Sequence, residues 1–107
     1  MINLKSKIYV AGHNGLVGSA IIRKLKLKGY KNLIFRSKKQ LNLKDQTKVF
    51  KFLKKNKPDF IFIAAAKVGG IYSNNKYKAE YFFDNISIQS NLINSAYLCG
   101  VKNLIFL

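Results

Sequence analysis

Short apolar runs alternate with longer amphipathic stretches along this chain of 107 residues. Four apolar runs predict buried strands, at residues 7–11, 32–36, 59–64 and 103–107. Between them, apolar residues at helical spacing predict helices at residues 16–28, 46–56 and from about 76–81 to 99. Residues 41–43 predict a further short strand or extended segment. The regular alternation of strands and helices is typical of an α/β fold with a parallel sheet.

The predicted helices carry end signals and apolar stripes. Asp45 is expected to cap the second helix and Pro58 to end it, while Gly29 and Gly100 are expected to close the first and third helices. The residues expected on buried helix faces are Val17, Ala20, Ile21 and Leu25, then Val49, Phe50 and Leu53, then Phe82, Ile86, Ile93, Ala96 and Tyr97. The whole series predicts one domain, the N-terminal part of a doubly wound parallel sheet, or Rossmann fold.

A glycine-rich turn joins the first predicted strand to the first predicted helix. Its glycines follow the pattern G-x-x-G-x-x-G, with a first gap one residue longer than the usual dinucleotide motif. We expect Gly12 to permit the tight turn, Gly15 to admit a pyrophosphate, and Gly18 to let the helix approach the strand. The alternative is a glycine-rich turn without a ligand. The remaining residues of this predicted phosphate turn are His13, Asn14, Leu16 and Val17.

The end of the second predicted strand bears on the choice of cofactor. An acidic residue at this position binds the ribose hydroxyls of NAD in many dinucleotide-binding domains. This chain has Arg36 there, and no carboxylate follows before Asp45. A guanidinium suits the 2′-phosphate of NADP, so the sequence predicts NADP. The alternative is a solvated basic turn.

Composition adds a strong basic charge and a few exclusions. The net charge of +16 would suit a nucleic-acid partner, but the lysines are spread along the chain and only two basic residues are arginine. We therefore expect no nucleic-acid partner. The sequence has no run of 18 apolar residues and no leader-like N-terminus, so we expect no membrane partner and a cytoplasmic location. A single cysteine, Cys99, excludes an internal disulfide framework, and we expect no metal site.

Two stretches together resemble the GDP-L-fucose synthases, a group within the extended short-chain dehydrogenase/reductase family. They are Gly-His-Asn-Gly-Leu-Val-Gly-Ser-Ala at residues 12–20 and Ala-Ala-Ala-Lys-Val-Gly-Gly-Ile at residues 64–71, and the second is the more specific. Residues 41–43 and 84–91 are similar too. The resemblance implies NADPH-dependent chemistry on a GDP-sugar, GDP-4-keto-6-deoxymannose: epimerisation at two carbons flanking a ketone, then hydride reduction of that ketone.

The resemblance also implies roles for individual residues. Asn42 and Leu43 would contact adenine, and Asn85 would be a structural asparagine near the active site. One difference is Asn14, which stands where some members of the family carry an arginine. Ala64, Ala65 and Ala66 would line the cofactor, and Lys67 with the three residues after it would approach the nicotinamide and the substrate.

The family's catalytic residues have no counterpart in residues 1–107, and we expect them beyond Leu107. The family's serine-cysteine stretch and its Tyr-x-x-x-Lys pair follow the strand that begins at Asn103, and the match at residues 72–76 is one of spacing alone. We therefore expect a truncated NAD(P)-binding domain without its C-terminal substrate domain, inactive by itself and part of a homodimer when full length. The alternatives are a non-catalytic dinucleotide-binding module and another NAD-dependent nucleotide-sugar epimerase or dehydratase.

Overall fold

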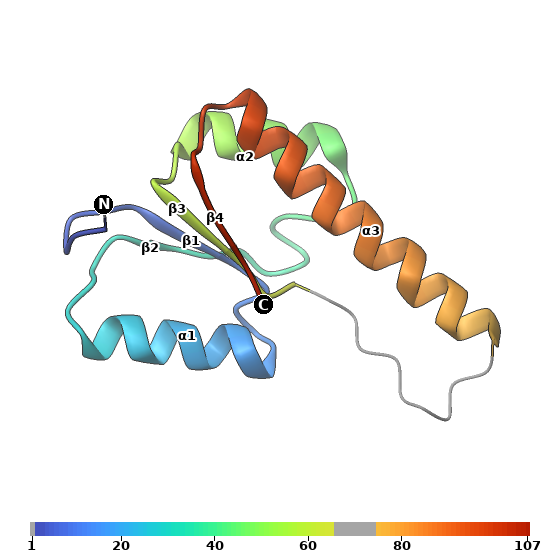
Figure 1. Cartoon of the computed structure of the whole chain (residues 1–107), viewed down its shortest axis with the longest axis horizontal. Coiled ribbons are helices and arrows are strands. Elements are labelled where there is room, and N and C mark those ends of the chain that lie inside the picture. Colours follow the sequence, from blue (N-terminus) through green and yellow to red (C-terminus); the bar gives the residue numbers. More distant parts are fainter. Residues whose placement is uncertain (1, 66–74) are drawn as a thin grey trace.

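The computed structural model describes residues 2–65 and 75–107 of the chain (Figure 1). The strands and helices predicted from the apolar pattern are present, most of them within one or two residues of the expected ends. The exception is the second strand, where only two of the five expected residues pair in the sheet. In chain order the elements are β1 (Ile8–Ala11), α1 (Leu16–Leu27), β2 (Leu33–Ile34), α2 (Gln46–Asn56), β3 (Phe60–Ile63), α3 (Asn75–Leu98) and β4 (Asn103–Phe106).

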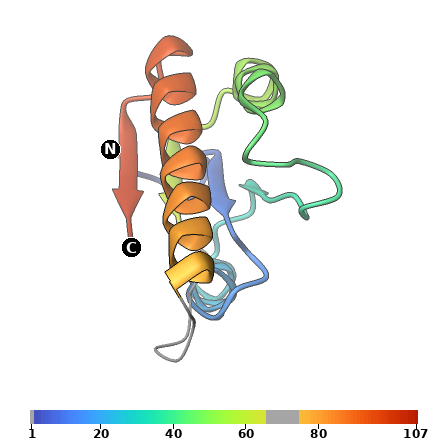
Figure 2. The same cartoon turned by 90° about the vertical axis from the view of Figure 1, so that its right-hand side faces the viewer.

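The four strands form one parallel sheet in the order β2-β1-β3-β4. The chain moves outward from β1 to β2, crosses back over β1, and continues outward through β3 to β4. Figures 1 and 2 show α1 on one face of this sheet and α2 and α3 on the other. This arrangement confirms the predicted doubly wound fold, and it places the reversal of strand order between β1 and β3.

The core is divided by the sheet because successive strand residues point to opposite faces. Tyr9 and Ala11 of β1 pack with Ile61 and Ile63 of β3 beneath α2 and α3. Ile8 and Val10 instead pack against Ile22 and Leu25 of α1. All four β1 residues are at most 1% exposed, so β1 is the most deeply buried strand of the sheet.

The last strand is shorter and more exposed than its apolar run predicts. β4 ends at Phe106, so Leu107, expected to be the fifth buried strand residue, lies just outside it. The Leu107 N–H still donates to the Ile63 carbonyl at 3.2 Å, but its side chain is 63% exposed. Ile105 and Phe106 are also exposed. The predicted strand is present, but its side chains are exposed because β4 pairs only with β3 and forms the edge of the described sheet.

The expected buried face of α1 was partly right: Leu25 is buried and Ile21 packs against the core, but the centre of the face differs from the prediction. Gly18, Ile22 and Leu25 are buried, whereas Val17 and Ala20 are exposed. Adjacent helical residues differ by about 100° around the axis, so the true face is rotated toward the glycine. The apolar pattern misses this face because Gly18 contributes no hydrophobic side chain to it.

Most of the buried face expected for α3 was wrong as well. Leu92 and Ala96 are fully buried and Ile88 is nearly so, whereas the side chains expected to be buried face outward, except for that of Ala96. The exposed residues are Phe82, Ile86, Ile93 and Tyr97. This helix carries apolar side chains on two sides, and only one side contacts the sheet and α2. Within residues 2–65 and 75–107, no helix combines the length and apolar character needed to cross a membrane.

The segment between β2 and α2 lies outside the sheet. Residues 41–43, expected to be a short strand or an extended segment, form no strand, because the backbone turns twice there. Leu41 is nevertheless 6% exposed and belongs to the core. As predicted, Asp45 caps α2, its carboxylate accepting from the Lys48 N–H at 3.1 Å. The C-cap of this helix is Lys57, which adopts a left-handed conformation with φ +45°.

Candidate dinucleotide-binding site

The glycine turn follows the carboxyl end of β1. The strand order reverses at this point, between β1 and β3. Gly12 has φ +87°, which favours glycine over any residue with a side chain. The Gly15 N–H donates to the Gly12 carbonyl at 3.1 Å, and Gly15 is the N-cap of α1. Gly15 has no side chain with which to cap the helix, and no acidic residue lies in the first turn. The first N–H groups of α1 have no acceptor within the helix and can serve an anion.

The three glycines of the turn meet different surroundings. A Cβ on Gly18 would lie 1.9 Å from the Gly12 carbonyl oxygen, so the helix packs against the turn backbone itself. A Cβ on Gly15 would approach that same oxygen only to 3.5 Å, an ordinary van der Waals distance. Protein packing therefore requires glycine at positions 12 and 18. At Gly15 the protein leaves room that a ligand could use.

The loop after β3 lies directly against the glycine turn. The Ala64 N–H donates to the Ala11 carbonyl at 2.9 Å, continuing the pairing of β1 with β3 past the strand ends. A Cβ on Gly12 would lie 2.7 Å from the Ala65 Cα, so the two loops are in backbone contact. The structure thus brings Ala64 and Ala65 to the predicted phosphate turn. Ala66 and Lys67, also predicted site residues, lie outside the described residues.

Arg36 lies two residues beyond the end of β2 and is exposed. One guanidinium nitrogen, Nη1, donates to the Phe35 carbonyl at 2.8 Å, and the guanidinium carbon lies 5.2 Å from the centre of the Phe52 ring on α2. The preceding residue, Phe35, packs its ring against His13 of the glycine turn, with 4.7 Å between ring centres. The contact between His13 and Phe35 therefore brings the glycine turn to the end of β2.

The proposed adenine segment is held by hydrogen bonds of its own. The Asn42 side-chain oxygen accepts from the Lys44 N–H at 3.0 Å. The Leu43 carbonyl accepts from the Asn91 side chain of α3 at 2.9 Å, a contact across 48 residues of sequence. Lys44 also approaches Asp84 of α3, with 3.8 Å between Nζ and Oδ1. The long helix α3 therefore positions this segment.

Two residues near the site were missed at the sequence level. Phe52 lies outside the predicted stripe of α2, yet its ring contacts both Arg36 and Tyr9. Burial raises the pKa of Tyr9 well above its usual value, and the positive charge of Arg36 opposes that rise. Asn91, whose side chain bonds to the Leu43 carbonyl, was given no role at the sequence level. The sequence signal that could have indicated Phe52 is its position as an aromatic residue near several lysines on a helix.

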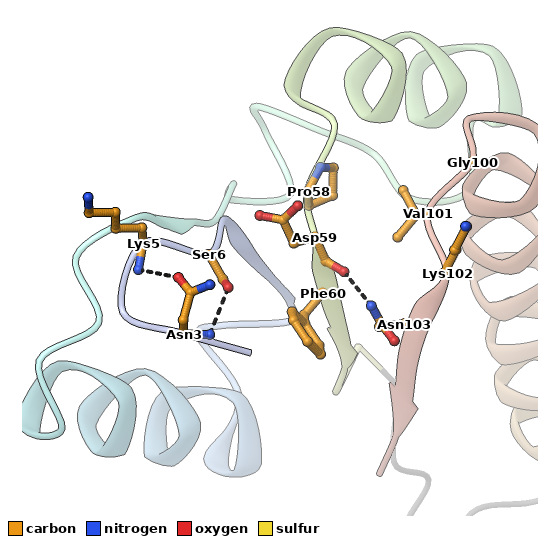
Figure 3. A pocket seen from close by; sticks show the side chains of 10 residues that line it. All are labelled: Asn3, Lys5, Ser6, Pro58, Asp59, Phe60, Gly100, Val101, Lys102 and Asn103. Carbon is orange, nitrogen blue, oxygen red and sulfur yellow. Dashed lines mark hydrogen bonds between the residues drawn. The ribbon is translucent and has the colours of Figure 1, made fainter. Parts of the chain in front are cut away.

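A separate cavity of about 380 Å³ opens at the amino-terminal ends of the strands, away from the glycine turn (Figure 3). It lies between the segment before β1 and the first residues of β3 and β4. Its polar groups bond to one another: the Ser6 hydroxyl accepts from the Asn3 N–H at 3.0 Å, and the Asn103 side chain donates to the Asp59 carbonyl at 3.1 Å. The strands run from these ends toward the glycine turn, so the cavity is no part of the dinucleotide site.

Comparison with known sequences decides the family. The sequence profile of the NAD dependent epimerase/dehydratase family matches residues 8–107. This chain belongs to that family.

The chain is also similar to individual epimerase/dehydratase family members. It is 50% identical over 107 residues to a protein named putative GDP-L-fucose synthase 2 from Arabidopsis thaliana, covering all of this chain and 33% of the relative. It is 43% identical over 103 residues to the GDP-L-fucose synthase of Escherichia coli (strain K12), covering 96% of this chain and 32% of that enzyme. The chain therefore spans about a third of the length of these relatives.

A solved structure gives the same correspondence in three dimensions. The GDP-mannoheptose C4 reductase from Campylobacter jejuni, solved with NADP bound, superposes with a TM-score of 0.93 at 36% identity. The match covers 99% of this chain and 33% of the reductase chain. The described strands and helices thus have the arrangement of the corresponding third of that reductase.

Proposed function

We propose that this chain forms the cofactor-binding part of an NADP-dependent epimerase/reductase that converts GDP-4-keto-6-deoxymannose to GDP-L-fucose. The observation that carries the proposal is the meeting of the glycine turn, the β3 loop and the end of β2 where the strand order reverses, the usual ligand position in such sheets. The names of the relatives support the GDP-sugar substrate, and the NADP in the C. jejuni reductase supports the cofactor.

The described residues fit a bound dinucleotide. The uncapped start of α1 offers N–H groups to a pyrophosphate, and Gly15 leaves room above them. Arg36 has five N–H donors, and one of them bonds to another residue within residues 2–65 and 75–107, so the others can bind a 2′-phosphate. Asn42 and Leu43 would contact adenine, as the resemblance implies. The residues proposed to lie along the rest of the cofactor are Ala64, Ala65, Ala66 and Lys67.

Binding and orientation are the part of the reaction proposed for this chain. The reduced nicotinamide supplies a hydride to the ketone carbon when the cofactor is bound. The proton donor for the developing alkoxide, the acid and base for epimerisation, and the sugar-binding residues are proposed to lie beyond the position of Leu107, in the portion of the relatives that this chain does not match. The resemblance extends the proposal to a homodimer of the full-length protein. The spread of the lysines and the apolar pattern, described above, extend it to a cytoplasmic location with no nucleic-acid partner.

The assignment of Arg36 is tested by comparing two cofactors that differ only in the 2′-phosphate. Charge-assisted hydrogen bonds contribute about 1.5–3 kcal/mol, so Arg36→Ala should weaken NADPH binding roughly 10- to 100-fold while leaving NADH binding nearly unchanged. Dissociation constants of the full-length protein for both cofactors, measured by calorimetry, give the answer. Arg23→Ala removes the other arginine of this chain, which is exposed on α1, and is the matched control. Equal losses for NADPH and NADH would contradict the proposal.

A further inference from the structure

The exposed guanidinium of Arg36 is held by a built aromatic support. Its carbon lies 5.2 Å from the centre of the Phe52 ring, within the range of a cation–π contact. Phe52 is half-buried on α2 and packs against the ring of Tyr9, with 4.8 Å between ring centres and 59° between planes. Tyr9 is 1% exposed and lies in the central strand β1. The ring beneath Arg36 is thus fixed by the core of the domain.

This support changes what Arg36 can do as a ligand-binding residue. An arginine free in solvent loses side-chain entropy when a phosphate fixes it, and that loss weakens binding. The planar guanidinium stacks on an aromatic face while its N–H groups stay available at the edge of the plane. The hydrogen bond from Nη1 to the Phe35 carbonyl restricts the side chain further. Both contacts restrict the guanidinium before any ligand arrives.

We infer that Phe52 is a positioning residue that holds the Arg36 guanidinium for the 2′-phosphate and so contributes to the preference for NADPH over NADH. The inference rests on the proposed function, because it needs Arg36 to bind that phosphate. Phe52 acts through Arg36 and needs no contact with the dinucleotide. Its effect is therefore confined to the cofactor that carries the 2′-phosphate.

The chain provides a matched control on the same helix. Phe50 is half-buried on α2 and lies under a cation as well, with the Lys54 Nζ 5.9 Å from its ring centre. Its backbone carbonyl lies 3.8 Å from the Cys99 sulfur, on the side of α2 that meets the end of α3. Phe50→Leu removes a ring and a cation–π contact just as Phe52→Leu does, but it leaves the support of Arg36 intact.

The test measures NADPH and NADH dissociation constants for the full-length protein and for each variant. A partly exposed cation–π contact is worth a factor of roughly 2 to 5, so Phe52→Leu should weaken NADPH binding by that factor and leave NADH unchanged. Phe52→Tyr keeps the ring and should keep the wild-type preference, as should Phe50→Leu. In an Arg36→Ala background, Phe52→Leu should have no further effect on NADPH. Should Phe52→Leu fail to fold, Phe52→Met removes the ring with a flexible apolar side chain.

Each other result overturns the inference in a recognisable way. If Arg36→Ala alters the preference but Phe52→Leu does not, or if Phe52→Leu weakens both cofactors equally, the positioning role is wrong and the proposed function stands. A further loss of NADPH affinity from Phe52→Leu in the Arg36→Ala background also removes the role. If Arg36→Ala leaves the preference unchanged, the 2′-phosphate assignment fails and the inference fails with it.

Discussion

Substituting alanine at two glycines of the same turn should separate a packing requirement from a ligand requirement. At Gly18 the new Cβ would lie 1.9 Å from the Gly12 carbonyl oxygen, against an ordinary contact of about 3.5 Å. The start of α1 would have to move by roughly 1.5 Å away from a backbone atom that cannot rotate aside. We expect a loss of about 3 kcal/mol in the free energy of unfolding, after the gain of about 1 kcal/mol that alanine gives a helix.

At Gly15 the same substitution should leave the fold almost unchanged. Its φ of −77° and ψ of 172° are open to any residue, and its Cβ would reach only ordinary contact with the Gly12 oxygen. Alanine is a slightly poorer N-cap than glycine but restricts the unfolded chain, so the net change should be within about 0.5 kcal/mol. Cofactor affinity should fall at least roughly 10-fold, because the methyl group would stand where we propose the pyrophosphate lies.

The assays are urea unfolding followed by circular dichroism without cofactor, and NADPH titration of each folded variant. Wild-type stability in Gly18→Ala would refute the packing argument. Wild-type NADPH affinity in Gly15→Ala would remove the glycine turn from the proposed site. Loss of stability in both variants would show that the turn is structural throughout.

Two further substitutions test local features of the fold. Lys57→Gly should raise the free energy of unfolding by about 0.5–1 kcal/mol, because it relieves a left-handed conformation at φ +45°, whereas Lys55→Gly inside α2 should lower it by about 1 kcal/mol; a destabilised Lys57→Gly would contradict this. Asn91→Ala should cost about 1 kcal/mol by leaving the Leu43 carbonyl without its partner from α3, and Asn94→Ala on the exposed side of that helix should cost almost nothing. Equal effects of the two asparagine changes in urea unfolding would argue against the role of Asn91.

The order of strands and helices could be predicted because each strand contains an unbroken run of apolar residues. The caps were predictable for the same local reason, since Asp45 and the glycines act within one turn of their own positions. The buried faces of α1 and α3 could not be fully predicted in this way. Gly18 is buried without being hydrophobic, and α3 offers two apolar sides of which the sheet and α2 cover one. Which side is covered depends on packing between elements. The spacing of apolar residues along one helix does not contain that information.

The candidate site also has a part that local sequence predicts and a part that depends on packing between elements. The glycine turn and Arg36 are readable because strand, turn and helix follow one another in sequence. The support of Arg36 by Phe52 and the bond from Asn91 to the Leu43 carbonyl join segments that only the folded sheet brings together. Arg36 and Phe52 are 16 positions apart in the sequence, and no spacing rule links them. The sequence therefore predicted the residues proposed to contact the ligand. It did not predict Phe52 and Asn91, which position those residues.

The crossing of the chain between β2 and β3 has a consequence for the order of events during folding. The Lys7 N–H donates to the Asp59 carboxylate at 2.8 Å across 52 residues of sequence, and Ile8 pairs in register with Phe60 next to it. The pairing of β1 with β3 closes a long loop of chain that contains α1, β2 and α2. Closing this loop is entropically costly and slow compared with local helix formation. A chain emerging from the ribosome can form α1 early, but the two loops that face each other at Gly12 and Ala65 meet only after β3 has been made and has joined β1. Protection of the newly made chain from proteolysis by a dinucleotide would therefore begin abruptly, at the length where β3 becomes available for pairing.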